Sequence, residues 1–343
     1  MKALVVGLGS VGRRHARNWA ALGLGEVWVC RQHGAAQPEP LGIEARMFSD
    51  LDQALAAGPD VVLVTNPTSL HVETARRAIE AGAHVLVEKP LGASLEGVAD
   101  LIQAAQRAGR VLAVGYTLRF HPGLARVREL LLDGAIGRPV SARAEFGEYL
   151  PDWHPWEDYR HSYSARRALG GGVVLTQSHE LDALCWLLGP PTCVFGFAER
   201  TGLLEVDTED VAEIVLRFGD GCLASLHVDE VRRPPQRWLE LTGEAGILRW
   251  EYDQNRVLQY APTAQAWRVE EGDPAFVRND MFLAELRQLA AAARGEPRQP
   301  LADGRQAAAV LAVGLAALRA STEGRAIDLA AEGPPVAEWL STP

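Results

Sequence analysis

Short apolar segments alternate with amphipathic segments over the first 120 residues of the chain. Five apolar runs of four or five residues predict buried strands, at Lys2–Val6, Glu26–Cys30, Val61–Thr65, Val85–Glu88 and Val111–Gly115. Segments with helical periodicity lie between them, at Val11–Leu22, His71–Ala81 and Leu95–Ala108. Strands that alternate with helices of ten or more residues are typical of βαβ units, so the pattern predicts an α/β domain with a parallel sheet.

The pattern changes after Phe120. Apolar and polar residues alternate over a long segment, Val140–Tyr149, which predicts a strand. From Val194 to Tyr260 the sequence predicts several further strands, separated by turn signals and not by helices. Helical segments flank this region, at Leu124–Asp133, Val173–Leu188, Phe276–Arg294 and Gly304–Ser321. We therefore expect a second, α+β domain with a large, mostly antiparallel open sheet, and domain limits of 1–121 and 122–343.

One face of this second sheet is expected to lack a cover within the chain. In the strand that begins at Val211, Ala212, Ile214 and Leu216 alternate with Val211, Glu213 and Val215. If helices cover only one face, the apolar part of the other gains by contact with a second copy. The sequence thus predicts a homodimer or homotetramer formed through the C-terminal sheet.

Composition narrows the class of protein. The 343 residues are 48% hydrophobic and 23% charged, with a net charge of −10, which argues against nucleic acid or an anionic membrane as the main partner. The four cysteines form no CxxC pair, as expected of free thiols in a reducing compartment. The first apolar run ends at Gly7 without signal-peptide features, and the longest apolar stretch, Ala307–Leu318, is too short for a membrane span. We therefore expect a cytoplasmic location.

A glycine-rich turn joins the first predicted strand to the first helix. Gly7-Leu8-Gly9-Ser10-Val11-Gly12 matches GxGxxG at the strand-to-helix junction where this motif binds a dinucleotide. The glycines allow a tight turn and close approach of backbone to pyrophosphate, and the helix N-terminus attracts phosphate charge. Gly7, Gly9, Ser10, Val11 and Gly12 are thus candidate cofactor-binding residues of a Rossmann domain.

The end of the second strand bears on the choice between NADP and NAD. An NAD-binding fold usually carries Asp or Glu there, whereas this chain has Cys30 followed by Arg31. No carboxylate at this position repels a 2′-phosphate, and Arg31 can bind one through charge-assisted hydrogen bonds. NADP is therefore the preferred cofactor and NAD the alternative, in which Arg31 stacks on adenine or faces solvent.

Several short motifs, in order, resemble the Gfo/Idh/MocA family, named for glucose–fructose oxidoreductase and inositol dehydrogenase. After the glycine turn they are Asn66-Pro67 with His71, Glu88-Lys89-Pro90, Gly115-Tyr116 with Arg119-Phe120, Gly170-Gly171-Gly172, His179-Glu180-Leu181-Asp182, Asp303-Gly304 and Ala320-Ser321. The resemblance covers nearly the whole length. It implies an NAD(P)-dependent dehydrogenase or reductase acting on CH–OH groups, with Asn66, Pro67, His71, Glu88 and Lys89 at the cofactor.

Lys89 and His179 are the main catalytic candidates. Lys89 follows a buried strand at its C-terminal end, where open α/β sheets bind ligands, and can stabilise developing alkoxide charge. The resemblance implies the same role, with Pro90 shaping the turn and a cis peptide bond as one option there. His179 is the candidate general acid/base, and Asp182, one helical turn later, can fix its tautomer.

The region before His179 departs from the family pattern. Many members carry an aspartate three or four residues before this histidine, where this chain has Thr176 and Leu175. The missing carboxylate leaves Lys89 and His179 with polar support from Thr176 or Gln177. A metal site that joins His179, Glu180 and Asp182 to His154 or His161 is disfavoured, because no metal-ligand spacing recurs.

The irregular segment from Tyr149 to Arg167 is rich in aromatic, histidine and arginine residues. Aromatic faces stack on sugar rings and guanidinium groups clamp carboxylates or phosphates, so the segment suits a sugar, polyol or nucleotide-sugar substrate; a surface loop with buried aromatics is the alternative. The substrate-binding candidates are Lys89, Tyr116, Arg119, Trp153, Arg160, Tyr163, Gln177 and His179, with Arg166 or Arg167 as further clamps.

Two other functions remain open on the sequence. A lyase or hydrolase that retains its nicotinamide for transient oxidation needs the same cofactor site. A non-catalytic NAD(P) sensor is favoured by the loss of the usual aspartate at Thr176. Net cofactor turnover distinguishes a dehydrogenase from both.

Overall fold

The structure is a computed structural model that describes residues 1–31, 40–297 and 300–341. The chain divides into two compact units, each made of two segments. The first unit comprises Met1–Thr117 and Val277–Ala307, and the second comprises Leu118–Phe276 and Ala308–Pro343. Each unit carries its own sheet and its own core, and each is described separately below.

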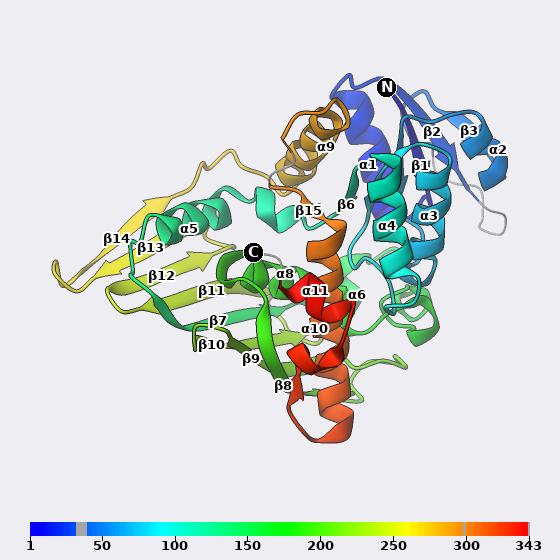
Figure 1. Ribbon diagram of the computed structural model, residues 1–343. Coiled ribbons are helices and arrows are strands. Elements are labelled where there is room, and N and C mark those ends of the chain that lie inside the picture. Colours follow the sequence, from blue (N-terminus) through cyan, green and yellow to red (C-terminus); the bar gives the residue numbers. More distant parts are fainter. Residues whose placement is uncertain (32–39, 298–299, 342–343) are drawn as a thin grey trace. The chain divides into compact units, whose positions relative to one another are not determined.

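The first unit is built on a mainly parallel sheet of seven strands (Figure 1). The strands are β1 (Lys2–Val6), β2 (Glu26–Cys30), β3 (Arg46–Phe48), β4 (Val61–Val64), β5 (His84–Val87), β6 (Leu112–Val114) and β15 (Ala302–Asp303), and their order is β15-β6-β5-β4-β1-β2-β3. The parallel strands carry the Rossmann order, with the chain reversing direction across the sheet between β1 and β4. The expected α/β Rossmann domain is confirmed.

The α-helices of the first unit are α1 (Ser10–Ala21), α2 (Leu51–Ala56), α3 (His71–Glu80), α4 (Val98–Ala108) and α9 (Asn279–Ala293). Helices α1, α2 and α3 contact the strands, whereas α4 packs against α3 and α9 against α1. The central strands β4, β5 and β6 are buried on both faces, which explains their continuous apolar sequence, and β3 at the edge is largely exposed. Helices α3 and α4 lie side by side, as Figure 1 shows.

A late segment of the chain returns to the first unit, although the sequence pattern assigned it to the second domain. Helix α9 packs against α1, where the side-chain amides of Asn18 and Asn279 exchange two hydrogen bonds of 3.0 Å. Strand β15 then pairs antiparallel with β6 at the edge of the sheet. The contact of Asn18 with Asn279 joins positions 261 residues apart, and β15 is also distant from β6 in the sequence, so local periodicity carries no signal for either contact.

The second unit is built on a nine-stranded, mostly antiparallel sheet. Its strands are β7 (Pro139–Gly147), β8 (Pro191–Glu199), β9 (Val211–Phe218), β10 (Leu223–Asp229), β11 (Gln236–Gly243), β12 (Gly246–Glu251), β13 (Arg256–Ala261), β14 (Ala266–Glu271) and β16 (Ile327–Asp328), in the order β14-β13-β12-β11-β7-β10-β9-β8-β16. Only the central pair, β7 and β10, is parallel among the described strands of this sheet. The expected α+β architecture with a large open sheet is confirmed.

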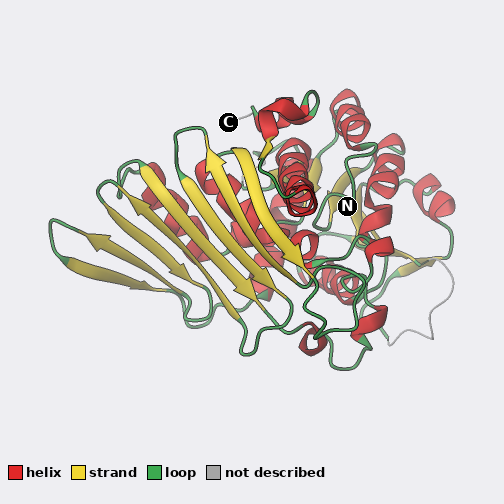
Figure 2. Ribbon diagram, turned by 90° about the horizontal axis from the view of Figure 1, so that it is seen from below, coloured by secondary structure: helices red, strands yellow, loops and turns green. Residues whose placement is uncertain are grey.

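Helices lie along one face of this second sheet (Figure 2). The helices of the second unit are α5 (Pro122–Leu132), α6 (Leu150–Trp153), α7 (Val173–Thr176), α8 (Ser178–Leu188), α11 (Val336–Leu340) and most of α10 (Gly304–Glu323), which begins in the first unit. In β9, Ala212, Ile214 and Leu216 are buried, and Glu213 and Val215 on the opposite face are exposed. The alternation predicted from the sequence therefore distinguishes a covered face from an open one.

The helix expected over Val173–Leu188 is interrupted once. Helix α7 ends at Thr176 and α8 begins at Ser178, because Gln177 leaves the helical backbone conformation with φ −100° and ψ 28°. The break falls within the segment that carries Thr176, Gln177 and His179. None of the helices in the described part of the chain is long and apolar enough to cross a membrane.

Candidate active site

The glycine turn of the first unit is fixed by close backbone packing. Gly7 has φ +101°, and a side chain there would meet the backbone of Asn66 at 2.7 Å. A Cβ on Gly12 would lie 2.1 Å from the Gly7 carbonyl oxygen and 2.6 Å from the Thr65 hydroxyl, which itself donates to the carbonyls of Val6 and Gly7. Two of the three glycines are therefore required by the contact between the turn and the end of β4.

Gly9 is different, because a Cβ there would meet nothing within 4 Å. It precedes the first residue of α1, whose N-terminus has no side-chain cap in the described structure and no acidic residue in its first turn. The helix therefore keeps its partial positive charge next to an open backbone surface. A pyrophosphate would fit this open surface, so Gly7, Gly9, Ser10, Val11 and Gly12 stay the predicted cofactor-binding residues.

The end of β2 carries the groups expected to contact the ribose. Cys30 is buried, and the backbone N–H of Arg31 donates to the carbonyl of Phe48. Burial and the nearby charge of Asp50 raise the pKa of the Cys30 thiol. Asp50 also caps α2 by accepting from the N–H of Gln53, so a carboxylate that the sequence did not point to lies close to this position.

His71 connects two of the predicted cofactor motifs. Its Nδ1 lies 2.8 Å from the carbonyl oxygen of Pro90 and its Nε2 lies 2.9 Å from that of Asn66, while the ring is buried. Asn66 in turn donates from its side-chain amide to the Thr74 hydroxyl. Burial lowers the pKa of His71. The histidine thus ties the Asn66-Pro67 turn to the turn after Lys89 rather than presenting its ring to a ligand.

Glu88 and Lys89 follow β5, at the same carboxyl edge of the sheet as the glycine turn. The Glu88 carboxylate lies 2.7 Å from Nε2 of His15, and its other oxygen accepts the backbone N–H of Lys89 at 3.3 Å. Burial raises the pKa of Glu88, but the hydrogen bond and charge of His15, with Lys89 and His71, outweigh burial and hold that pKa below its ordinary value. The peptide bond between Lys89 and Pro90 is cis.

In the second unit Asp182 is engaged by Arg119. The guanidinium donates to both carboxylate oxygens, at 2.9 and 2.6 Å, and both side chains are almost fully buried. The Arg119 guanidinium also lies 5.7 Å from the ring centroid of Trp186. Burial raises the pKa of Asp182 and the guanidinium opposes the rise. Both residues are predicted at the reaction site, Asp182 as the partner of His179 and Arg119 at the substrate, and in the structure the two side chains bond each other.

The residues around the break between α7 and α8 are polar and largely enclosed. Thr176, Gln177 and Glu180 are buried, whereas His179 is partly exposed. Glu180 lies 2.8 Å from Arg237 of β11, an ion pair that points away from His179 as helical geometry predicts. His179 is therefore the titratable group of this segment that keeps access to solvent.

The aromatic segment from Tyr149 to Arg167 packs mainly on its own unit. Tyr149, Trp153 and Tyr159 lie against a small apolar cluster of Leu150, Ala165, Leu204 and Val206. Arg160 is exposed and bonds Asp158 and Glu205, and its hydrogen bond lowers the pKa of Asp158 to about 2. Tyr163 is half-buried, and its carbonyl oxygen lies 2.3 Å from the position of a Cβ on Gly171. The segment thus contains both the buried aromatics and the candidate substrate contacts.

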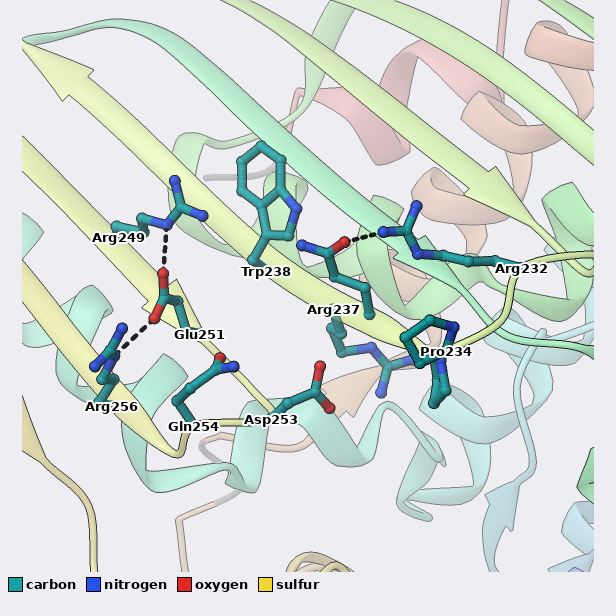
Figure 3. Close-up of a pocket in the computed structure, with 11 residues that line it drawn as sticks. Arg232, Pro234, Arg237, Trp238, Arg249, Glu251, Asp253, Gln254 and Arg256 are labelled. Carbon is teal, nitrogen blue, oxygen red and sulfur yellow. Dashed lines mark hydrogen bonds and ion pairs between the residues drawn. The ribbon is translucent and has the colours of Figure 1, made fainter.

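Figure 3 shows a cavity of about 270 Å³ in the second unit, at the ends of β11, β12 and β13. Its walls carry Trp238 and four arginines, and Glu251 accepts hydrogen bonds from both Arg249 and Arg256. None of the site residues predicted from the sequence lines this cavity. Its charges are largely paired with one another, which is typical of a structural ion-pair network. Among the described residues, no cluster of His, Cys, Asp and Glu can hold a metal ion.

Two residues of the first unit were missed by the sequence analysis, His15 and Glu285. His15 lies on α1 three residues after the last glycine of the turn and contacts Glu88. Glu285 lies on α9 at a fully buried position. A signal existed for Glu285, because it occupies the same apolar helix face as Phe282, Leu286 and Leu289, where a carboxyl group is unexpected.

Comparison with known proteins covers both units. Residues 1–116 match the oxidoreductase family with an NAD-binding Rossmann fold, and residues 124–249 match the GFO/IDH/MocA C-terminal domain. The chain is 30% identical to 1,5-anhydro-D-fructose reductase of Ensifer adhaerens over 309 residues, which covers 87% of this chain and 88% of the relative. It is 31% identical to UDP-N-acetylglucosamine 3-dehydrogenase of Acidithiobacillus ferrooxidans, covering 70% and 71%.

Among solved structures, levoglucosan dehydrogenase in complex with NADH and levoglucosan has the same fold. The TM-score is 0.83 at 19% identity, and the match covers 96% of this chain and 99% of the other.

The pairing of Arg119 with Asp182 generates a prediction about stability. Arg119→Met removes the only cation that bonds this buried carboxylate among the described residues, so the free energy of unfolding should fall by about 3–5 kcal/mol. Arg119→Met/Asp182→Leu should recover most of that loss, because no buried charge is left. Urea unfolding measures all three proteins.

Arg138→Met is the matched control, since the pair of Arg138 with Glu244 is exposed and contributes little. An Arg119→Met protein as stable as the parent would show that the guanidinium is not structural and is available to a substrate.

Proposed function

This chain belongs to the Gfo/Idh/MocA family of oxidoreductases, and on that premise we propose that it transfers hydride between a nicotinamide cofactor and a hydroxyl-bearing or carbonyl carbon of a carbohydrate-like substrate. The substrate class is a sugar, polyol or nucleotide sugar. The observation that carries the proposal is the open backbone surface at Gly9 and the N-terminus of α1, on the same sheet edge as Lys89. The two relatives described above are named for reactions on carbohydrates.

The chain's own residues then have distinct tasks. The turn from Gly7 to Gly12 binds the pyrophosphate. Asn66 and Pro67 shape the carboxyl edge of the sheet beside it, and His71 holds their turn in place through its contact with the Asn66 carbonyl oxygen. When bound, nicotinamide supplies the hydride acceptor or donor. Lys89, held after β5 next to the ionised Glu88, donates a hydrogen bond to the reacting oxygen and stabilises negative charge there.

His179 is the proposed general acid/base. A partly exposed imidazole can exchange its proton with solvent, and imidazole is the side chain best suited to proton transfer to or from a hydroxyl near neutral pH. Asp182 acts indirectly, because both of its carboxylate oxygens bond Arg119 and this pair holds α8 in place. Polar support for the His179 imidazole therefore comes from Thr176 or Gln177. Tyr116, Trp153, Arg160 and Tyr163 remain proposed substrate contacts.

A first prediction concerns the cofactor. We expect NADPH to bind more tightly than NADH, because Cys30 replaces the usual carboxylate and Arg31 can pair with a 2′-phosphate. Fluorescence titration with NADPH and with NADH gives the ratio of their two dissociation constants. Arg31→Ala should reduce the preference for NADPH that this ratio expresses. Arg107→Ala, a change on the outer side of α4, controls for loss of one positive charge. Equal affinities in the parent protein would contradict the NADP assignment.

A second prediction concerns the chemistry. Lys89→Met should lower kcat by about 10²–10³-fold, the usual effect of losing one oriented donor to developing charge, while cofactor affinity stays nearly intact. His179→Ala should lower kcat by about 10²–10⁴-fold and flatten one limb of the pH–rate profile. Steady-state kinetics with a panel of sugars and nucleotide sugars measures both.

Thr176→Asp is the companion variant, since it restores the carboxylate that many family members carry, and a change in kcat with unchanged cofactor affinity is expected. If Lys89→Met and His179→Ala both kept parental activity, the assignment would be lost and attention would move to the Tyr149–Arg167 segment. Binding of cofactor with no turnover of any substrate would favour the sensor function.

A third prediction concerns assembly. We propose that a second copy covers the open face of the second sheet, forming a dimer or a tetramer. Phe197 and Val215 are 57% and 46% exposed on this face, and Phe195 lies directly beside Val215 on the neighbouring strand. An exposed apolar patch of this kind gains by pairing with itself about a twofold axis. Light scattering at micromolar concentration should report at least a dimer for the parent protein. The Phe197→Asp variant should be a monomer under the same conditions. A monomeric parent protein would contradict the prediction.

A further inference from the structure

Helix α9 of the first unit carries a buried carboxyl group that the proposed mechanism does not use. Glu285 is completely buried, and neither of its carboxyl oxygens makes a hydrogen bond with any described group. Its neighbours on the same helix face are the apolar residues Phe282, Leu286 and Leu289. A carboxyl group in such a place is destabilising unless it is neutral, so its presence requires an explanation.

Two other elements bring titratable groups to this part of the first unit. His15 of α1 packs edge-on against Phe282 of α9, with ring centroids 5.7 Å apart, and its Nε2 contacts Glu88 at 2.7 Å. The Nδ1 atom of His15 is buried and makes no hydrogen bond within the described structure. The Glu88 carboxylate lies over Gly115, about 3.4 Å from where a Cβ would be. His15 and Glu285 are fully buried and the Glu88 side chain is 13% exposed. The three belong to one cluster of titratable groups, because His15 contacts both Glu88 and Phe282, which lies one helical turn from Glu285 on α9.

The two carboxyl groups of this cluster are driven toward opposite protonation states. Burial and the negative charge of Glu88 raise the pKa of Glu285 well above its ordinary value. Glu88, by contrast, is held ionised by His15 and by Lys89. Two acids that repel each other in a buried site divide in this way, one keeping its proton while the other loses it.

We propose that Glu285 is a positioning residue of the active site, which acts with His15 to keep a single negative charge on Glu88 beside Lys89. This role rests on the proposed function, because Lys89 is the group whose electrostatic surroundings would be controlled. As long as Glu285 is neutral, Glu88 is the one charged carboxylate of this pair next to Lys89. Ionisation of Glu285 would add a second carboxylate charge, which would change the electrostatic field at Lys89 and at the reacting oxygen.

The charged and titratable groups that bear on the cluster come from four elements. They are His15 and Arg14 on α1, Glu88 and Lys89 after β5, His71 on α3, and Glu285 itself on α9. Arg14 lies over the Phe282 ring, 4.6 Å from its centroid, so the ring separates its guanidinium from the interior. His71 and Lys89 act on Glu88, and Glu88 acts on Glu285.

Thermal stability tests the protonation state without any substrate. Glu285 has a higher pKa folded than unfolded, so the folded state resists its ionisation, and the parent protein should lose stability relative to Glu285→Gln as the pH rises from about 5 toward 9. The difference in Tm between the two proteins should therefore move in favour of the glutamine variant across this range. Glu96→Gln, at an exposed position of the same unit, controls for the loss of one carboxylate and should show no such trend.

Kinetics then tests the positioning role. In Glu285→Gln the alkaline limb of the kcat profile should shift by about one pH unit or more, which is a tenfold change in kcat at a fixed alkaline pH. Leu289→Ala, on the same face of α9, controls for damage to helix packing and should lower Tm while the shape of the profile stays unchanged. If Glu285→Gln fails to fold, Glu285→Met replaces it in both measurements, since methionine fills a similar volume.

A difference in Tm that is constant from pH 5 to 9 would overturn the proposal, because Glu285 would then be an ordinary carboxylate. A pH-dependent difference in Tm with an unchanged kcat profile would overturn the positioning role. Absence of turnover in the parent protein with every substrate would count against the proposed function instead, and the stability result would stand on its own.

Discussion

The contact between the glycine turn and the end of β4 is the constraint on which the rest of the first unit depends. Gly7 and Gly12 bring the turn so close to Thr65 and Asn66 that no side chain fits between them. This contact fixes the start of α1 at the carboxyl edge of the sheet, with its N-terminus and the backbone at Gly9 open. It also sets the position of His15 one turn along the helix, within hydrogen-bond distance of Glu88.

Buried charge is organised differently in the two units. In the second unit, Arg119 neutralises Asp182 with two hydrogen bonds, an arrangement that stabilises only as long as both partners are present. In the first unit, the Glu88 carboxylate contacts the His15 imidazole, and no guanidinium is bonded to Glu88 or Glu285 among the described residues. Keeping one buried acid ionised and the other neutral lowers the stability of the folded protein. Such pairs are nevertheless typical of catalytic sites, where unequal surroundings give two acids different pKa values.

The fold was largely predictable from the sequence because its signals are local. Apolar runs and the glycine spacing predicted the Rossmann unit. The alternation of apolar and polar residues along the strands predicted the open antiparallel sheet. The return of residues 277–307 to the first unit was not predictable, because it depends on contacts such as that of Asn18 with Asn279. Within the site, Lys89 and His179 are predicted from their positions in short motifs, and their catalytic roles stay predictions. The partners of Asp182 and Glu88 were not, since ion pairs between distant residues leave no periodic pattern.

Transfer of a labelled hydride tests the central claim, that this chain is a dehydrogenase or reductase of carbohydrate-like substrates, most directly. The protein is incubated with reduced cofactor deuterated on the transferring face of nicotinamide C4 and with a panel of keto-sugars, and products are examined by mass spectrometry. The account predicts one deuterium on carbon in the product for each cofactor oxidised. Product that forms without net cofactor oxidation or label, or binding of cofactor with no product from any carbonyl substrate, would contradict it.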